Sequence, residues 1–432
     1  MILQKKFIMR TIILFILFSF SIASLSQSSF DKYFTDKVLR FDFMLAGNCQ
    51  KTIVYPVGMK EEPFWAGSNT NLTDPFHSGN FKYEVFDEAG NILIYSRGFC
   101  TLYQEWQTTA EAKVMERSFY EVATMPFPKN KVRFVLSMRE RDGLFSKLYE
   151  TKIDPDDYFI RKEDPVNVGK TKIYNGGDPH SCVDLAFIAE GYKENEIGKF
   201  RKDVKKMADY LFDEAPFRDY KDKFNIWAVE VISQESGADI PGEKIYVNTA
   251  LNSSFFTFDL DRYLTTQDIK SVNDYAAAVP HDNIIVLINS TRYGGGGVYN
   301  YYSGTTTGHP LSLKVFVHEF GHGFAGLADE YYSSSVAYEE FYPLNVEPWE
   351  PNITTMVNFE SKWKKMIEKE TPAPTPSEEK YKNVTGLFEG GGYSAKGIYR
   401  SEMECRMMSN SPKGFCSVCR EAIKKMIEFY IK

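Results

Sequence analysis

The first part of the chain alternates apolar and polar residues with a period of two. The segments 41–45 and 132–138 both follow this pattern, which is typical of antiparallel strands that bury one face. Residues 81–85 and 92–95 are two further apolar runs separated by a short acidic and glycine-containing turn, as in a β-hairpin. We therefore predict an antiparallel β-sandwich over residues 27–158.

The alternation stops near residue 158. Charged residues and prolines replace it over residues 154–167, which is how domain boundaries often look. We place a linker at residues 159–170 and a second domain at residues 171–432.

In this second domain the apolar pattern changes its period. Residues 183–189 form a nearly continuous apolar run, typical of a strand that is covered on both faces. Apolar residues at spacings of three and four predict a helix over residues 197–211, and two further strands are predicted at 224–232 and 283–288. A final amphipathic helix is predicted from Cys416 to Tyr430. The second domain is therefore expected to contain a mixed sheet covered by helices, which makes the whole chain α+β.

The N-terminus has the pattern of a secretory signal over residues 1–26. Lys5, Lys6 and Arg10 form a positive flank before a short apolar run at residues 11–23, and small residues at its end precede a cleavage point. The run is shorter than the about 20 residues that span a bilayer, and no other stretch is long and apolar enough. We expect a protein that is exported: secreted, periplasmic or associated with the cell surface.

Composition and charge narrow the classes of function. Hydrophobic residues make up 43% of the chain and aromatic residues 15%, which is enough for packed cores. The formal charge of -7 argues against nucleic acid as a partner. Three of the six cysteines, Cys405, Cys416 and Cys419, lie close together in sequence. The Cys416-x-x-Cys419 spacing could be a redox pair or half a zinc site, but there is no second such pair, so a local disulfide from Cys405 to Cys416 or Cys419 is favoured.

The most specific motif is His-Glu-x-x-His at residues 318–322. On a helix, residues four apart lie on one face, so His318 and His322 can direct their imidazoles at a single zinc ion. Glu319 lies at the edge of the same face, where its carboxylate can reach a zinc-activated water as the general base. The alternative is that two histidines are spaced by four without any function.

A catalytic zinc needs a third protein ligand and one open position. We expect the helix to end at Gly326, because glycine readily adopts the left-handed conformation that ends helices. A chain that turns there can bring Asp329 back to the metal, with Glu330 as the alternative ligand. This arrangement resembles the metzincin signature, in which a glycine and the third ligand follow the second histidine by three and six residues. Here the matching residues follow by four and seven.

Metzincins also have a methionine turn beneath the zinc, and Met407 in the sequence Cys-Arg-Met-Met is the candidate, with Met408 as the alternative. Together with the motif at His318 and the later Phe-Cys-x-Val-Cys segment, these residues resemble the IgA peptidase-like family of bacterial zinc metallopeptidases. The resemblance covers residues from about 170 to 432. It implies a metzincin-like fold, one catalytic zinc and peptidase activity, and it does not establish an immunoglobulin as the substrate.

Further candidates for the site are less specific. The glycine-rich segment Gly296 to Tyr302 could be an open sheet edge that pairs with an extended peptide, or a loop without a binding role. Four tyrosines are candidates for a second oxyanion donor: Tyr331, Tyr332, Tyr393 and Tyr399. Trp349, Trp363 and Phe388 could line a specificity pocket, although core packing is the simpler interpretation. We interpret His180 and Glu190 as structural residues and not as ligands.

These patterns predict a secreted zinc endopeptidase that acts on proteins or peptides. Two alternatives remain at this point. The first is a zinc hydrolase of a non-peptide amide or ester, and the second is a non-catalytic surface-binding protein derived from a peptidase. The sequence makes no prediction of the oligomeric state.

Overall fold

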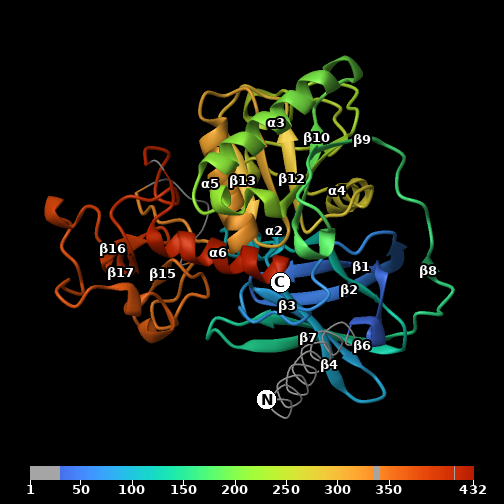
Figure 1. The fold of residues 1–432 in the computed structure, drawn as a ribbon, viewed down its shortest axis with the longest axis horizontal. Helices are drawn as coiled ribbons and strands as arrows, with labels where there is room; N and C mark the ends of the chain where they lie inside the picture. The colour runs from blue at the N-terminus through green and yellow to red at the C-terminus, as the bar shows by residue number, and fades with distance from the viewer. Residues whose placement is uncertain (1–29, 334–340, 413) are drawn as a thin grey trace, which may run out of the picture.

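A computed structural model describes residues 30–333, 341–412 and 414–432, and its fold is α+β (Figure 1). The expected signal segment, residues 1–26, lies outside the described residues. Within the described ranges, none of the helices combines the length and the apolar character needed to cross a bilayer.

Two four-stranded sheets form the N-terminal part of the chain. The first has the order β5-β1-β2-β8 and the second β4-β3-β6-β7. Their bounds are β1 Phe34–Asn48, β2 Lys51–Glu62, β3 Phe81–Asp87, β4 Ile92–Phe99, β5 Arg117–Pro128, β6 Val132–Arg139, β7 Phe145–Ile153 and β8 Ile160–Arg161. The sheets pack face to face through the alternating aromatic residues, with the ring centroids of Phe41 and Phe134 5.1 Å apart. The predicted hairpin is confirmed, because β3 and β4 pair antiparallel.

The sequence predicted antiparallel pairing throughout the N-terminal sheets, and one pair of strands departs from this prediction. Strand β8 joins the first sheet parallel to β2, through Met59 with Ile160 and Lys60 with Arg161. The expected linker thus returns to the N-terminal sheet before it enters the second part of the chain. A short helix, α2 (Leu102–Gln107), connects the two N-terminal sheets between β4 and β5.

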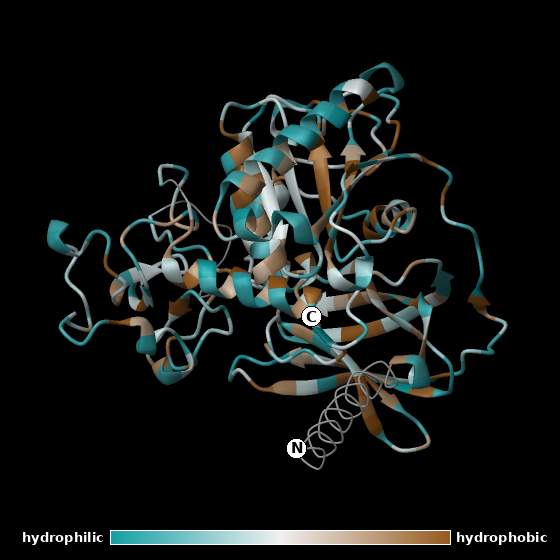
Figure 2. Cartoon of the chain, viewed as in Figure 1, coloured by the Kyte–Doolittle hydropathy of each residue, from teal (hydrophilic) through white to brown (hydrophobic). Residues whose placement is uncertain are grey.

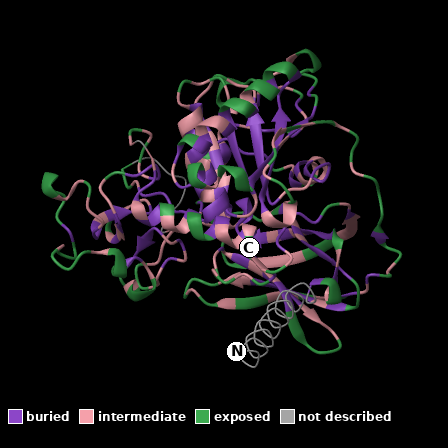
Figure 3. Ribbon diagram, in the orientation of Figure 1, coloured by how far each residue is buried: buried purple, intermediate pink, exposed green. Residues whose placement is uncertain are grey.

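A six-stranded sheet with the order β13-β14-β12-β10-β11-β9 is the centre of the second part. Its strands are β9 Gly169–Tyr174, β10 Val183–Glu190, β11 Phe224–Glu230, β12 Asn283–Ile288, β13 Gly295–Val298 and β14 Tyr302–Thr306. The four central strands are parallel, and the two edge strands pair antiparallel. The three predicted strands, at 183–189, 224–232 and 283–288, are confirmed. Strands β10 and β12 are buried along their length and consist mostly of hydrophobic residues (Figures 2 and 3).

The two faces of this sheet have different partners. Leu185 and Phe187 of β10 share a core with α3 (Ile197–Asp213), α5 (Ser312–Ala325) and α6 (Ser417–Ile431). Ala186 and Ile188 point to the opposite face, where they share a smaller core with α4 (Ile269–Ala276). The helices predicted at 197–211 and 416–430 are confirmed. This alternation along β10 places α5, which carries the His-Glu-x-x-His motif, on the face with the larger core.

A small three-stranded sheet follows the motif helix in sequence. It contains β15 (Ile353–Thr354), β16 (Phe388–Gly391) and β17 (Ser394–Arg400), in the order β15-β17-β16. In Figure 1 it lies at the side of the molecule away from α4. Helix α6 then returns across the centre and packs on α5, where the rings of Phe324 and Tyr430 are 5.9 Å apart.

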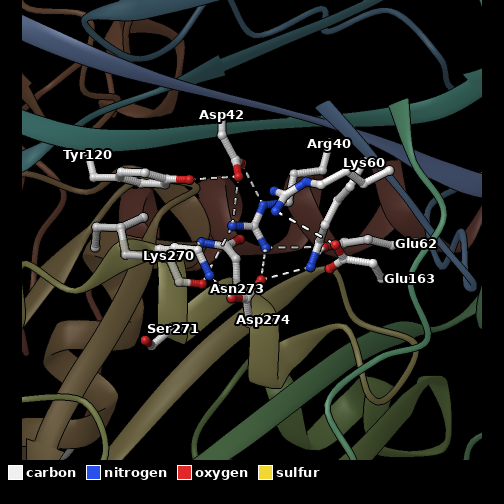
Figure 4. Close-up of polar contacts among 12 residues, drawn as sticks. Arg40, Asp42, Lys60, Glu62, Tyr120, Glu163, Lys270, Ser271, Asn273 and Asp274 are labelled. Carbon is white, nitrogen blue, oxygen red and sulfur yellow. Dashed lines mark hydrogen bonds and ion pairs between the residues drawn. The ribbon is translucent and has the colours of Figure 1, made fainter. Parts of the chain in front are cut away.

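A buried ionic cluster joins the N-terminal sheets to the second part (Figure 4). The guanidinium of Arg40 on β1 is fully buried and contacts Asp42 at 2.6 Å and Asp274 of α4 at 2.7 Å. Lys60 reaches the same Asp274 oxygen at 2.7 Å, and Tyr120 donates its hydroxyl hydrogen to Asp42. Because these charges leave water together and satisfy one another, the cluster fixes how the two parts of the chain meet.

Candidate metal centre and active site

Helix α5 presents both histidines of the motif on one face and ends where the sequence predicted. Gly326 caps the helix in the left-handed conformation, with φ 61°, and its N–H bonds to the carbonyl of His322 at 3.0 Å. Residues after the cap therefore reverse direction, and Ala328 is held by the side chain of Asn352, which both donates to and accepts from its backbone. This turn carries Asp329 back towards the histidines.

The side chains of His318, His322 and Asp329 converge on one point. Asp329 Oδ1 lies 3.1 Å from His318 Nε2 and 3.3 Å from His322 Nε2, and the two Nε2 atoms are 3.2 Å apart. A tetrahedral zinc with bonds of about 2.0–2.1 Å separates its nitrogen and oxygen ligands by about 3.3 Å. The three atoms thus have the spacing of three corners of such a site.

In the neutral imidazoles, hydrogen bonds on the far side of each ring leave both Nε2 atoms without a proton. His318 Nδ1 lies 2.9 Å from the Arg406 carbonyl oxygen, and His322 Nδ1 lies 2.5 Å from the Leu327 carbonyl oxygen. Each Nδ1–H must donate to its carbonyl, so in the neutral ring the lone pair is at Nε2. Two lone pairs and a carboxylate oxygen that face one another repel unless a cation lies between them, and the residues therefore fit a metal.

The electrostatics of the cluster also favour a positive charge. Burial alone would lower the pKa of His322, yet the charge and hydrogen bond of Asp329, together with Glu319, raise it to about 9. Burial would raise the pKa of Asp329, and the two histidines instead hold it well below its usual range. Without a metal, a proton on His322 takes the place of the cation.

Glu319 lies beside the three converging atoms without forming part of their triangle. One of its carboxylate oxygens and one nitrogen of each histidine all lie within 4.8 Å of one another. Burial raises the pKa of Glu319, and the adjacent imidazoles partly offset this. The backbone of β13 runs against the same turn of helix, and a Cβ at Gly295 would lie 2.9 Å from Glu319 Oε1. The glycines of β13 are what permit this close approach.

A cavity of about 400 Å³ opens beside these residues. Strand β13 and helix α5 form one wall, and residues 326–331 form another. The N-terminal part contributes as well, through Asn80, Cys100, Gln104 and Glu105, although its sequence had given no sign of a role in the site. Of the three aromatic residues considered for a pocket, Trp349 lines the cavity, whereas Trp363 and Phe388 are core residues.

Strand β13 is an edge strand of the six-stranded sheet, as expected, but the accessible edge is much shorter than Gly296 to Tyr302. Gly295 already pairs with another segment, because Leu264 N–H donates to its carbonyl and its own N–H donates to Arg262. The carbonyl of Tyr299 accepts from Cys100 N–H, and Tyr302 begins the inner strand β14. Backbone N–H and C=O groups of successive residues in a strand point alternately to its two sides. The backbone groups of Gly297, midway between Gly295 and Tyr299, therefore point to the same outer side, where Gly297 lines the cavity.

The four candidate tyrosines have different positions. Tyr393 donates its hydroxyl hydrogen to Asp329 Oδ2 at 2.8 Å, and Tyr331 also lines the cavity. Tyr332 and Tyr399 are not among the residues that line it. Sequence reasoning missed Tyr293, which lines the cavity near Glu319; burial raises its pKa, and the Glu319 charge raises it further. The sequence feature that could have indicated Tyr293 is its position directly before the glycine run at residues 294–297.

Met407 lies beneath the motif helix. It is fully buried, and a Cβ at Gly321, between the two histidines, would be 3.0 Å from its sulfur. Met408 instead lines the cavity. The neighbouring Arg406 carbonyl is the one that holds His318, so this turn supports that histidine directly.

Other sequence candidates have structural surroundings. The Glu330 carboxylate points away from the histidines, towards the sulfurs of Cys416 and Cys419 at 3.9 and 3.4 Å. Buried Glu190 accepts hydrogen bonds from residues 249–253, and His180 contacts Gly67 and Asp36 at the surface of the N-terminal part. All six cysteines are free, so the predicted disulfide of Cys405 is wrong. The Cys405 and Cys419 sulfurs are 3.7 Å apart, too far for a bond of about 2.05 Å.

Comparison with known families agrees with this geometry. The model of the family described as IgA Peptidase M64 matches residues 171–383 and 377–427, and so spans more than half of the chain. The chain belongs to the IgA peptidase M64 family. A second model, described as Peptidase M64 N-terminus, matches residues 29–150, which form most of the two N-terminal sheets. A search of curated proteins finds no match.

Membership of the M64 family identifies the chain as a peptidase and confirms the resemblance drawn from the motifs. The first segment of the IgA Peptidase M64 match, residues 171–383, contains the whole of α5 and the turn that carries Asp329. The second segment, residues 377–427, contains the turn from Cys405 to Met407. The N-terminal match includes Cys100, Gln104 and Glu105, so the part of an M64 chain that precedes the peptidase region contributes to the cavity wall here.

Proposed function

We propose that this peptidase is a zinc-dependent endopeptidase, in which His318, His322 and Asp329 hold the metal and Glu319 is the general base. The observation that carries the proposal is the convergence of two imidazole nitrogens and one carboxylate oxygen at 3.1 to 3.3 Å beside a cavity. Zinc suits this mixed nitrogen and oxygen donor set with one open side. When bound, it would supply the Lewis acid that activates water and neutralises charge on the scissile carbonyl oxygen.

The residues of the chain have distinct roles in this proposal. Glu319 accepts the proton of the attacking water on its carboxylate and then transfers it to the leaving amine nitrogen. The carbonyl oxygens of Arg406 and Leu327 hold each imidazole in the tautomer that exposes Nε2. Tyr393 orients the Asp329 carboxylate through its other oxygen.

We also propose Tyr293 as the hydrogen-bond donor to the scissile carbonyl oxygen. Its hydroxyl oxygen accepts a hydrogen bond from Asn410 Nδ2 at 3.1 Å, which leaves its own hydrogen to donate. Tyr393 is less suited because its hydroxyl already donates to Asp329. A fixed donor at the position where negative charge develops lowers the barrier of the reaction.

An extended peptide fits the wall formed by β13. Only a short part of this edge faces the cavity, so a substrate would exchange one pair of main-chain hydrogen bonds, with Gly297, and not a full strand pairing. Trp349 and Tyr299, whose rings are 5.5 Å apart, border the same wall and offer an apolar surface to a substrate side chain. A protein or peptide is therefore the proposed substrate.

The decisive experiment compares Glu319→Gln with wild type on peptides whose two termini are blocked. The variant should bind zinc as wild type does and should lose hydrolysis by several orders of magnitude, because only the base is removed. Glu368→Gln, at an exposed position away from the cavity, is the matched control and should be fully active. A chelator should abolish wild-type activity, and added zinc should restore it.

Three results would overturn this proposal. Near wild-type hydrolysis by Glu319→Gln would show that Glu319 is not the general base. Cleavage only of peptides with a free terminus would show that the enzyme is an exopeptidase. Cleavage of simple amides or esters, with no cleavage of any peptide, would favour a non-peptide hydrolase instead.

We further propose that the protein is exported, on the basis of the charged, apolar and small-residue pattern of residues 1–26. N-terminal sequencing of the protein recovered from outside the cytoplasm should find a chain that begins near residue 27. Recovery of a chain that still starts at Met1 would contradict export through this segment.

A further inference from the structure

A second cluster of potential ligands lies immediately behind the first. The side chains of Glu330, Cys405, Cys416 and Cys419 are all buried, and one ligand atom from each lies within 4.8 Å of the others. Glu330 follows Asp329 directly in sequence, so adjacent residues point to two different centres. The cysteines come from the turn before Met407 and from the start of α6, with Cys416 as the N-cap of that helix.

The distances in this cluster fit a tetrahedral metal ion. Zinc–sulfur bonds of about 2.3 Å place two sulfur ligands about 3.8 Å apart, and a sulfur and an oxygen ligand about 3.6 Å apart. The Cys405 and Cys419 sulfurs are separated by 3.7 Å. Glu330 Oε1 lies 3.4 Å from the Cys419 sulfur and 3.9 Å from the Cys416 sulfur. A disulfide would need two of these sulfurs at about 2.05 Å.

Backbone N–H groups point at the sulfurs, as is usual around thiolates. Met407 N–H and Cys416 N–H both donate to Cys405 Sγ, at 3.5 and 3.3 Å. Cys419 N–H donates to Cys416 Sγ at 3.4 Å. Asn352 Nδ2 donates to Glu330 Oε1 at 3.0 Å, so the carboxylate is oriented too. Donors to three of the four side chains, Cys405, Cys416 and Glu330, fix their directions and stabilise negative charge on them.

Because the cluster is buried, its acidic groups must either stay protonated or share a cation. Glu330 is 0% exposed, and its Oε2 has no hydrogen-bond partner in the described part of the chain. A carboxyl group and three thiols packed together in a protein interior are costly unless they are neutral or share a cation. One divalent ion would satisfy all four groups at once.

We propose that Glu330, Cys405, Cys416 and Cys419 bind a second zinc ion, which is structural and closed to substrate. Four protein ligands leave no position for water, which distinguishes this centre from the three-ligand site at Asp329. The ion would tie the segment of Asp329 and Glu330 to the turn of residues 405–407, a link that the bond from Glu330 N–H to the Met407 carbonyl already begins. That turn also holds His318 through Arg406, so the second ion supports the first centre from behind.

The test is a metal count on the full chain that does not depend on activity. Wild type, loaded with zinc and dialysed, should retain two zinc ions per chain by elemental analysis. A His318→Ala/His322→Ala double variant should retain one. Loaded with Co²⁺ instead, this double variant should show the near-ultraviolet charge-transfer absorption of thiolate-bound cobalt, which a site without sulfur cannot produce.

Variants of the cysteine cluster give the reciprocal result. Cys416→Ser/Cys419→Ser should lose the charge-transfer absorption and one zinc, and Glu330→Gln should weaken retention of the same ion by about 10-fold or more. If the cysteine variant does not fold, the histidine double variant alone decides the matter.

Two results would overturn the second site. The first is a histidine double variant that retains no zinc, or that binds cobalt without thiolate absorption. The second is a disulfide among the three cysteines in freshly purified wild type, detected by alkylating the denatured chain without reductant. Failure of the proposed peptidase activity would leave both measurements unchanged, so the two proposals are tested separately.

Discussion

Tyr393 donates its hydroxyl hydrogen to Asp329 Oδ2 at 2.8 Å, across 64 residues of sequence. The other carboxylate oxygen of Asp329 faces both histidines. The hydroxyl therefore fixes the rotation of the carboxylate, and with it the position of the oxygen that faces the histidines.

Removal of that hydroxyl should weaken metal binding. We expect Tyr393→Phe to lower zinc affinity by about 10- to 100-fold, as is usual when a partner of a metal ligand is lost, while the fold is retained. Competition with a chelator of known affinity measures the effect. Tyr399→Phe, on β17 and away from the cavity lining, is the matched control; equal affinities of the two variants would contradict the role of Tyr393.

Tyr293→Phe should reduce turnover and leave zinc binding unchanged. Loss of one preorganised oxyanion donor typically lowers kcat by about 10²- to 10³-fold. The measurement is kcat and KM on a blocked peptide, with Tyr332→Phe at an exposed position as control. An effect on KM alone would indicate that Tyr293 contacts the substrate and does not stabilise the transition state.

Gly297→Ala should destabilise the protein, whereas Gly304→Ala should not. A Cβ at Gly297 would overlap the backbone carbonyl of Glu319, because β13 lies directly on α5. At Gly304 on the neighbouring β14, the nearest atom would be 3.7 Å away, an ordinary contact. Overpacking of this kind costs about 1–3 kcal/mol, and urea unfolding of both variants measures it. Equal midpoints would show that β13 can move away from the helix.

The ionic cluster of Figure 4 provides a test of the contact between the N-terminal sheets and α4. Arg40→Met should lower the free energy of unfolding by about 3–5 kcal/mol, because it leaves the buried Asp42 carboxylate without a cation. Lys37→Met on the same strand is the control. Its partner is Glu61 and the Lys37 side chain is 50% exposed, so its loss should cost about 1 kcal/mol or less.

Stability should fall as the pH rises from about 4 to about 8, because of a buried carboxyl pair. Asp184 N–H donates to Asp282 Oδ2 at 2.9 Å. Burial first, and the charge of Asp282 second, raise the pKa of Asp184 to about 8. The folded state therefore holds a proton that the unfolded chain releases near pH 4, so this contribution is complete below that pH and is lost as the pH approaches 8.

Asp184→Asn keeps the shape of the side chain and removes its titration. The decline in the free energy of unfolding between pH 5 and pH 8, measured with urea, should become smaller in this variant than in wild type. Asp219→Asn, at an exposed position, should show the wild-type slope. An unchanged slope in Asp184→Asn would mean that Asp184 is ionised throughout this range.

Local spacing in the sequence predicted the parts of the protein that depend on neighbouring residues. Alternation with a period of two located β1, β3, β4 and β6, and a continuous apolar run located β10, because side-chain direction in a strand follows directly from position. The spacing of four between His318 and His322 placed both imidazoles on one helix face, and Gly326 ended that helix for reasons local to its own backbone.

Only the tertiary structure decided which distant groups meet. Asp329 and Glu330 are adjacent and chemically alike, and the sequence could not choose between them; the fold sends one to the histidines and the other to three cysteines. The same holds for Tyr393, for Arg406 behind His318, and for the cavity wall supplied by the N-terminal sheets. These contacts join segments about 60 to 240 residues apart. No local period encodes them, because they depend on how packed elements fill space and not on the direction of any one strand or helix.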